Sequence, residues 1–372
     1  MELFDNLGGK LGFGMMRLPK LEDGSFDLEQ IKEMVDLFME AGLNYFDTAY
    51  VYTGSEEVTK QALVDRYPRD SFFLTSKINA GSWAAKDAEE AKKELETSLE
   101  RSGAGYFDMY LLHALGKGNI DNYDNYGLWD FVKEAKEKGL IKHYGFSFHD
   151  DAEFLDKLLT EHPDVEMVQL QINYADWESE SVQSRKCYEV CVKHGKKVIV
   201  MEPVKGGTLA NPPESIKTLF KNYDENASAA SWAIRYVASL DNVFVVLSGM
   251  STLEQMKDNL SYMQDFKPMN EEELAIIKEA QDILANTPQI PCTGCSYCTD
   301  GCPMKINIPS IFSAMNKDLI YEAFEASKNS YEIAIRDRGK ASDCIHCMQC
   351  EDACPQHIEI TSWLEKAAEK YD

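Results

Sequence analysis

Short apolar runs alternate with longer amphipathic stretches over roughly the first 265 residues. The short runs are rich in β-branched and aromatic residues, which favours buried strands, and the longer stretches repeat apolar residues at i, i+3 and i+4, which favours helices. Eight strands are predicted, at residues 11–14, 45–47, 72–76, 109–112, 143–147, 167–170, 197–201 and 243–247. Helices are predicted between them, for example at 28–41, 86–101, 128–138 and 227–239.

Eight strand-helix units predict an α/β fold in which a (β/α)8 TIM barrel occupies most of the chain. The competing architecture is a doubly wound open sheet. That fold binds dinucleotides through a G-x-G-x-x-G turn after its first strand, and no such turn follows residues 11–14. The pattern therefore favours the barrel.

A capping box marks the start of one more helix after the eighth strand. Asn270 is followed by Glu273, and the apolar pattern continues to Leu284 before Pro288 and Pro291 end it. We therefore predict a barrel over residues 1–268, a linking helix over 269–290 and a second domain over 291–372.

The balance of charge excludes some classes of partner. The 372 residues carry a formal net charge of -25, and no basic block offsets the carboxylates, so nucleic acid and anionic membrane surfaces are unfavourable partners. The N-terminal sequence MELFDNLGGK has no basic start followed by an apolar stretch, and no apolar run reaches membrane-spanning length. We expect a cytoplasmic protein.

Eight of the ten cysteines lie after Pro291, in two runs of the same spacing. Each run reads C-x2-C-x2-C-x3-C-P, which is the spacing of bacterial ferredoxins. The second domain is therefore predicted to be a small, mainly helical, ferredoxin-like iron-sulfur domain. The metal-binding residues are Cys292, Cys295, Cys298 and Cys302 in the first run, and Cys344, Cys347, Cys350 and Cys354 in the second.

Soft thiolates suit two four-iron four-sulfur clusters, because a tight loop presents three sulfurs to one cluster and the fourth ligand comes from elsewhere. In two-cluster ferredoxins the fourth cysteine of each run serves the other cluster. We assign one cluster to Cys292, Cys295, Cys298 and Cys354, and the other to Cys344, Cys347, Cys350 and Cys302. Paired zinc sites are the alternative, but they leave the third C-x2-C step and the trailing Cys-Pro unexplained. The spacing leaves open whether the clusters transfer electrons or only stabilise the domain.

Cys187 and Cys191 are the two remaining cysteines. They lie four residues apart in a helical stretch and share one face. A buried pair of small apolar groups is the ordinary interpretation, and a redox role is the alternative.

Polar residues follow three neighbouring strands of the predicted barrel. Asp47 ends the second strand with Tyr52 shortly after it, Lys77 closes the third, and His113 closes the fourth. In a TIM barrel the C-terminal ends of the strands meet at one mouth, so these side chains can converge. The arrangement, with Gly54-Ser55-Glu56 after the second strand, resembles the aldo/keto reductases, whose tetrad is aspartate, tyrosine, lysine and histidine in this order.

The same four side chains suit carbonyl reduction. Hydride addition creates an alkoxide that needs a proton, and a phenol with a pKa near 10 is a poor donor at neutral pH. An ammonium group at Lys77 would stabilise the phenolate of Tyr52, with Asp47 holding the ammonium and His113 orienting the carbonyl. The alternative is a structural Asp47–Lys77 ion pair with Tyr52 on a surface loop.

The resemblance also implies residues that hold NADP or NAD. Ser147 and Gln169 match the positions that bind the nicotinamide carboxamide, and two later loops match those along the pyrophosphate and adenosine. The implied loop residues are Glu202, Val204, Lys205, Gly206, Gly249, Ser251, Gln255 and Asn259.

Four positions depart from the usual family pattern. Phe148 follows Ser147 in place of asparagine, Met201 stands where an aromatic residue often stacks on the nicotinamide, and Gly249 and Gln255 replace basic residues at the 2′-phosphate. The choice between NADP and NAD therefore stays open. His149 is either a surface residue or a further group at the mouth.

These features predict a nicotinamide-dependent oxidoreductase that reduces a carbonyl or oxidises an alcohol on a small molecule. Its clusters would couple hydride chemistry to a one-electron carrier such as ferredoxin, flavodoxin or a flavoprotein. The alternatives are a reductase with structural or oxygen-sensing clusters, and a redox-sensing or electron-carrier subunit without turnover.

Overall fold

The computed structural model describes residues 4, 6–81, 84–321 and 323–372. The chain divides into two compact units. The first contains residues 1–178, 183–203 and 230–270, and the second contains residues 179–182, 204–229 and 271–372. The segment after the seventh strand thus belongs to the same unit as the cysteine runs.

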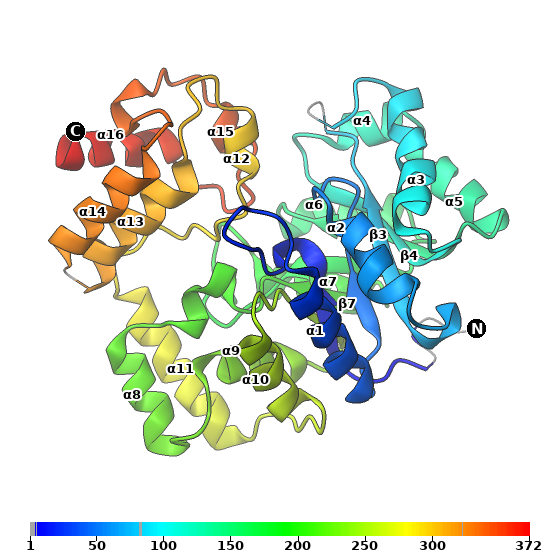
Figure 1. The fold of residues 1–372 in the computed structure, drawn as a ribbon, viewed down its shortest axis with the longest axis horizontal. Helices are drawn as coiled ribbons and strands as arrows, with labels where there is room; N and C mark the ends of the chain where they lie inside the picture. The colour runs from blue at the N-terminus through cyan, green and yellow to red at the C-terminus, as the bar shows by residue number, and fades with distance from the viewer. Residues whose placement is uncertain (1–3, 5, 82–83, 322) are drawn as a thin grey trace. The chain divides into compact units, whose positions relative to one another are not determined.

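Eight parallel strands close into a barrel in the first unit, in the order β1 to β8 with β1 paired to β8. Figure 1 labels three of these strands, β3, β4 and β7. The strands are β1 Leu11–Gly14, β2 Tyr45–Asp47, β3 Phe73–Ile78, β4 Phe107–Leu115, β5 Ile141–Phe148, β6 Met167–Gln171, β7 Lys197–Met201 and β8 Val243–Ser248. The predicted (β/α)8 fold is confirmed. The largest difference from the predicted strands is at β4, which begins before residue 109 and ends after residue 112.

Alternate strand residues fill the barrel interior. Tyr45, Met109, Leu111, Met167 and Ile199 belong to one buried apolar cluster. Because strand side chains alternate between faces, the residues between them point outward against the helices. These helices are α1 Leu28–Glu40, α2 Ser55–Thr59, α3 Ala88–Ser102, α4 Ile120–Asn125, α5 Leu128–Glu137, α6 Ala152–Glu161, α7 Ser184–Lys193, α9 Ala229–Ala238 and α10 Leu253–Met263.

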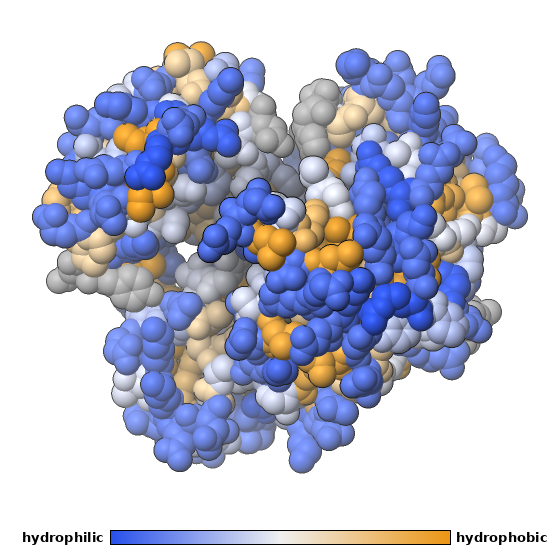
Figure 2. Space-filling view, in the orientation of Figure 1, coloured by the Kyte–Doolittle hydropathy of each residue, from blue (hydrophilic) through white to orange (hydrophobic). Residues whose placement is uncertain are grey.

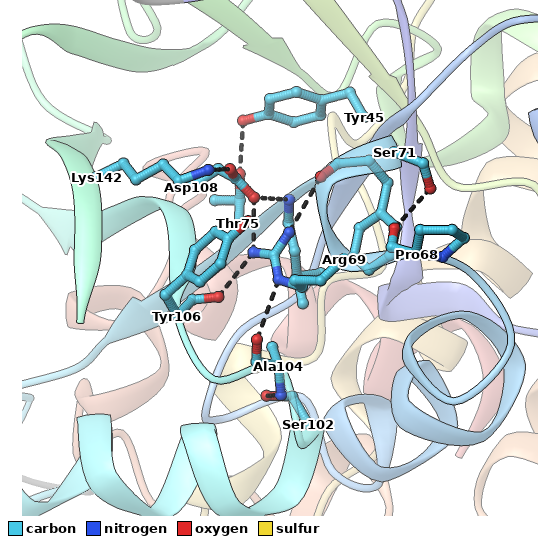
Figure 3. Close-up of polar contacts among 12 residues, drawn as sticks. Tyr45, Pro68, Arg69, Ser71, Thr75, Ser102, Ala104, Tyr106, Asp108 and Lys142 are labelled. Carbon is cyan, nitrogen blue, oxygen red and sulfur yellow. Dashed lines mark hydrogen bonds and ion pairs between the residues drawn. The ribbon is translucent and has the colours of Figure 1, made fainter. Parts of the chain in front are cut away.

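An ion-pair network joins the N-terminal ends of β3, β4 and β5 (Figure 3). Arg69 donates to Asp108 Oδ2 at 2.7 Å, and Lys142 donates to Asp108 Oδ1 at 2.9 Å. The Arg69 guanidinium also donates to the carbonyl oxygens of Phe72, Ala104 and Tyr106. Charged groups at this end of a TIM barrel serve stability, because the catalytic mouth is the opposite end. The network therefore anchors the strands that carry polar groups at their other ends.

The second unit repeats one structural motif. Each position of the first cysteine run recurs 52 positions later, from Cys292 at Cys344 to Cys302 at Cys354. The backbone repeats as well, because Ser296 and Met348 are both left-handed, with φ of 68° and 65°. The helices of the unit are α8 Glu214–Tyr223, α11 Glu271–Ala285, α12 Tyr297–Asp300, α13 Ile308–Tyr321, α14 Phe324–Ala334, α15 Gln349–Asp352 and α16 Ile360–Tyr371.

A separate apolar core supports this unit. Four isoleucines at equivalent positions of the repeat are buried in it, namely Ile306, Ile308, Ile358 and Ile360. Cys298 and Cys350, the third cysteine of each run, belong to the same core. The cysteine loops therefore connect helices that pack around this core. Separately, α11 corresponds to the helix predicted from Asn270 to Leu284.

The visible surface is mostly hydrophilic, with apolar side chains gathered in small groups (Figure 2). Among the described residues, no helix combines the length and the apolar character needed to span a bilayer.

Candidate functional site

The C-terminal ends of β2, β3 and β4 bring Asp47, Lys77 and His113 to the barrel mouth. All three side chains are buried. Lys77 Nζ donates to Asp47 Oδ1 at 2.5 Å and to the Thr48 carbonyl oxygen at 2.8 Å. The ammonium is therefore held in one orientation by two acceptors.

Tyr52 lies in the loop between β2 and α2, where its backbone N–H donates to the Ala49 carbonyl oxygen at 3.0 Å. Its ring centroid lies 4.9 Å from Lys77 Nζ and 5.7 Å from the His113 ring, which it meets edge-on at 81°. Tyr52 is half-buried, so its ring is accessible while its two neighbours are not. The structure thus brings the four predicted catalytic side chains together and does not place Tyr52 on a remote surface loop.

Burial sets the electrostatics of this group. Desolvation lowers the pKa of Lys77, and the Asp47 carboxylate opposes that shift. Desolvation, helped by the Lys77 charge, also holds the pKa of His113 well below its usual value. His113 is therefore neutral near pH 7, and its Nδ1 atom makes no hydrogen bond to any described residue. The mouth combines a fixed cation, a neutral imidazole and an accessible phenol.

The two residues predicted to hold the nicotinamide are buried beside this group. Ser147 and Gln169 pair across β5 and β6, and Gln169 Nε2 donates to Asp47 Oδ2 at 3.2 Å. The Ser147 hydroxyl oxygen accepts a hydrogen bond from the Ala114 backbone N–H at 2.6 Å. Ala114 has a left-handed backbone, with φ of 55°, and such strain in a non-glycine residue gathers at functional sites.

The residues predicted for the adenosine side gather around a residue that the sequence did not single out. Arg17 follows β1, its Nη2 atom lies 3.5 Å from Glu202 Oε1, and its carbonyl oxygen accepts from the Ser251 hydroxyl at 2.7 Å. A Cβ added to Gly249 would lie 3.7 Å from the Arg17 Cβ. Arg17 therefore supplies a cation where Gly249 has none. Arg17 could not be assigned from the sequence, because only closure of the barrel places β1 beside β8.

The other two residues predicted in this loop, Gln255 and Asn259, are joined by a hydrogen bond. Gln255 accepts through Oε1 from the Ser251 N–H at 2.7 Å, and its carbonyl oxygen accepts from Asn259 Nδ2 at 2.8 Å. Asn259 is buried and Gln255 is exposed.

Val204, Lys205 and Gly206 belong to the second unit. Gly206 is left-handed, with φ of 63°, and a Cβ added to it would lie 2.1 Å from the Thr293 carbonyl oxygen. Thr293 follows Cys292, so the loop predicted to bind phosphates packs directly on the first cysteine loop. The Val204 carbonyl oxygen accepts from Gly207 N–H at 3.0 Å and closes the turn.

The eight cysteines of the two runs line two separate cavities. The first is lined by Cys292, Cys295, Cys298 and Cys354. The second is lined by Cys302, Cys344, Cys347 and Cys350. In each cavity three cysteines come from one run and the fourth comes from the other, which is the crossed grouping expected from the spacing.

The donor sets fit iron-sulfur clusters. Gly294 N–H donates to Cys292 Sγ at 3.4 Å. Burial raises the pKa of Cys354, and backbone N–H groups of Ile358, Gln356 and His357 oppose that shift. Such bonds to sulfur are among the features that tune clusters.

Burial raises the pKa of Cys298, and the neighbouring sulfurs of Cys295 and Cys292 raise it further. Thiolates crowded in this way need a bound cation, since like charges in a dry site repel.

The two cysteines of the barrel unit behave as apolar core residues. Cys187 and Cys191 are buried in α7, and burial raises the pKa of Cys187 to about 12. A thiol that stays protonated is a poor nucleophile. The geometry therefore supports the packing interpretation.

His149 is half-buried and interacts electrostatically with His113, which places it near the mouth.

Comparisons with known proteins agree with both parts of the chain. Residues 10–282 match the aldo/keto reductase family, and residues 291–359 match the 4Fe-4S dicluster domain. A methylglyoxal reductase from Yersinia pestis is 28% identical over 256 residues, which cover 68% of this chain and 84% of that protein. An aldo-keto reductase from Mycolicibacterium paratuberculosis is 28% identical over 259 residues, which cover 67% of this chain and 79% of that protein.

Solved structures share the barrel fold. An aldo-keto reductase from Bacillus halodurans superposes with a TM-score of 0.57 at 24% identity, covering 74% of this chain and 95% of that one. One from Klebsiella pneumoniae, in complex with NADPH, superposes with a TM-score of 0.57 at 21% identity and covers 72% and 89% of the two chains.

Proposed function

This chain belongs to the aldo/keto reductase family, and we propose on that basis that it is a nicotinamide-dependent oxidoreductase that reduces a small carbonyl compound or oxidises the corresponding alcohol. When bound, NADP or NAD would supply or accept the hydride. The observation that carries the proposal is the Lys77 ammonium, held by Asp47 and 4.9 Å from the Tyr52 ring.

Tyr52 acts as the proton donor in this proposal. The alkoxide that forms as the carbonyl accepts hydride takes its proton from the phenol, and the Lys77 charge stabilises the phenolate that remains. His113 is neutral, so it orients the carbonyl oxygen by hydrogen bonding without adding a second positive charge. Asp47 keeps the ammonium in place and is itself fixed by Gln169.

Ser147 and Gln169 are proposed to hold the nicotinamide, because both are buried next to the tetrad. Glu202, Val204, Lys205, Gly206, Gly249, Ser251, Gln255 and Asn259 are proposed to line the rest of the nucleotide. To these we add Arg17, whose guanidinium lies beside Glu202 and whose aliphatic side-chain carbons lie beside Gly249.

Replacing the phenol tests the catalytic proposal. The Tyr52→Phe variant should lose about 10²- to 10⁴-fold in kcat for NAD(P)H oxidation with small aldehydes, while its affinity for the nucleotide stays unchanged. Methylglyoxal belongs in the substrate set, because the Yersinia relative is named for it. The matched control is Tyr126→Phe, which removes a half-buried phenol that donates to the Lys86 carbonyl oxygen. Unchanged turnover in Tyr52→Phe would exclude Tyr52 as the donor.

We further propose that the two cysteine cavities hold two four-iron four-sulfur clusters, one on Cys292, Cys295, Cys298 and Cys354 and the other on Cys344, Cys347, Cys350 and Cys302. Bound clusters would exchange single electrons with ferredoxin, flavodoxin or a flavoprotein, two for each hydride. The support is the crossed grouping of the sulfurs. Anaerobic NAD(P)H should bleach the cluster absorbance, and persistent colour would contradict the coupling.

A second function for the clusters is favoured by one observation. Cys298 and Cys350 belong to the apolar core of the unit, so the clusters could stabilise the domain or report on oxygen without passing electrons. Cys347→Ser separates the two functions. A structural role predicts an unfolded domain, whereas a transfer role predicts a folded protein with intact hydride chemistry. We also place the protein in the cytoplasm, because the proposed clusters need cysteine thiols that stay reduced.

A further inference from the structure

The loop that carries the second cysteine run is open to solvent. Of the ten cysteines, all of which lie in the described part of the chain, Cys347 alone is exposed. The residues on both sides of it, from Ile345 to Gln349, are exposed as well. A cluster bound in this cavity would therefore have one sulfur ligand at the molecular surface.

Apolar side chains surround this exposed sulfur. Ile345 and Met304 line the second cavity and are 57% and 37% exposed. Met348 is 43% exposed, and its sulfur lies 3.8 Å from the hydroxyl of Thr361, another residue of the cavity wall. Large apolar residues exposed together on a soluble unit are a feature of protein interaction sites.

The first cavity lacks these properties. Its loop residue Thr293 is buried and packs under Gly206, and the exposed residues beside its cysteines are Gly294 and Ser296. Among the described residues, no exposed large apolar side chain lines this cavity. The two halves of the repeat share a backbone conformation but differ in the exposed apolar side chains around their cavities.

The charged residues within the second cysteine run and the segment after it are acidic, whereas Lys340 and Lys366 flank these segments and Lys305 follows Met304. Between residues 341 and 365 the sequence has five carboxylates, Asp343, Glu351, Asp352, Glu359 and Glu365, and no lysine or arginine. Glu365 lies 3.6 Å from His346 in the exposed loop, and Glu351 accepts from Thr361 at 2.7 Å. A partner that docks here must bring positive charge to the rim of an apolar centre.

We propose that the face formed by Met304, Ile345, Cys347 and Met348 is the docking site for a flavoprotein whose redox centre is surrounded by lysine and arginine, rather than for an acidic ferredoxin or flavodoxin. The inference rests on the proposed function in that it takes the second cavity to hold a cluster. One electron passes from the reduced second cluster to the oxidised carrier, with no bond formed or broken, and two such transfers match one hydride. The first cluster, whose loop residue Thr293 is buried against Gly206, has no direct exchange with the carrier.

Electron transfer to a carrier of known charge tests this face. The clusters of the holoenzyme are reduced with dithionite, excess reductant is removed, and the protein is mixed in a stopped-flow instrument with oxidised cytochrome c, a basic carrier, or with an acidic ferredoxin. The rate with the cytochrome should exceed the rate with the ferredoxin and should fall as salt is raised, because screening weakens attraction between opposite charges.

The decisive variant is Ile345→Lys, compared with Ile333→Lys. Both isoleucines are 57% exposed, but Ile333 lies on α14 and lines neither cavity. Ile345→Lys should lower the second-order rate constant and the calorimetric affinity for the cytochrome about tenfold or more, through like-charge repulsion and loss of the apolar contact. Ile333→Lys should change both by less than about twofold, as expected for a substitution outside an interface. Oxidation by a small uncharged quinone should be the same in both variants.

Equal effects of the two substitutions, or faster transfer to the ferredoxin at low salt, would overturn the proposal. Because dithionite supplies the electrons, the result does not depend on hydride transfer at the barrel. Docking that succeeds while NAD(P)H fails to bleach the clusters would reject the proposed coupling alone. Holoenzyme without iron in the second cavity would reject the cluster assignment instead.

Discussion

Gly206 and Thr293 approach each other so closely that a Cβ on Gly206 would lie 2.1 Å from the Thr293 carbonyl oxygen. This contact joins the loop after β7 to the first cysteine loop within one compact unit. A change in the position of one loop therefore displaces the other loop.

Gly206→Ala should destabilise the first cysteine loop. The added methyl group clashes with backbone, and alanine at a φ of 63° adds strain, together costing about 1–3 kcal/mol. The measurement is the rate at which cluster absorbance is lost to an iron chelator. Gly207→Ala is the matched control, because Gly207 also has positive φ, 99°, but nothing lies within 4 Å of an added Cβ. Equal rates in the two variants would show that the contact is unimportant.

Two double variants test the crossed ligation with equal numbers of cysteines removed. Cys295→Ala with Cys354→Ala empties one cavity and leaves the other ligand set complete, so about four irons per chain should remain. Cys295→Ala with Cys302→Ala removes one ligand from each cavity and should retain less iron. The measurement is the iron and sulfide content per chain of the two reconstituted variants. The opposite order would indicate that each run binds its own cluster.

Arg17→Met tests whether Arg17 replaces the basic residues missing at Gly249 and Gln255. A charge-assisted hydrogen bond contributes about 1.5–3 kcal/mol, so the Kd for NADPH should rise by about 10- to 100-fold. The Kd for NADH, which lacks the 2′-phosphate, should change less. Both constants can be measured by quenching of protein fluorescence. The control is Arg66→Met, which removes a surface partner of Asp36. An equal loss for both nucleotides would place Arg17 at the shared pyrophosphate, and no loss would contradict the proposal.

The stability of the barrel should depend on pH through Glu94. This side chain is buried between α3 and β3, where Asn79 N–H donates to it at 2.7 Å, and burial raises its pKa to about 8. The folded protein then binds a proton that the unfolded chain releases near pH 4.5, so this contribution to stability is lost as pH rises through 8.

Glu94→Gln should remove that dependence. Relative to the variant, the wild-type free energy of unfolding should fall by up to about 1.4 kcal/mol for each pH unit between 5 and 8. Urea unfolding under anaerobic conditions at several pH values measures it. The control is Glu96→Gln on the exposed side of the same helix. Parallel pH profiles for wild type and Glu94→Gln would show that Glu94 is ionised in the folded state.

Much of this protein could be predicted from the sequence, because the signals are local. The eight strands follow from short apolar runs, and the two cysteine loops follow from a spacing that one loop must satisfy to present three sulfurs to one cluster. Asp47, Lys77 and His113 could be assigned to one mouth because parallel strands end at the same edge.

Other features required the tertiary structure, because they join residues that are distant in the chain. Closure of the barrel pairs β1 with β8 and so sets Arg17 beside Gly249. The exposure of Ile345, Cys347 and Met348, against the burial of Thr293, distinguishes two loops of identical spacing. Spacing determines which atoms can bind, whereas packing of non-local segments determines which of them water and partners can reach. The sequence thus determined the fold and the ligand types, and the tertiary structure decided their surroundings.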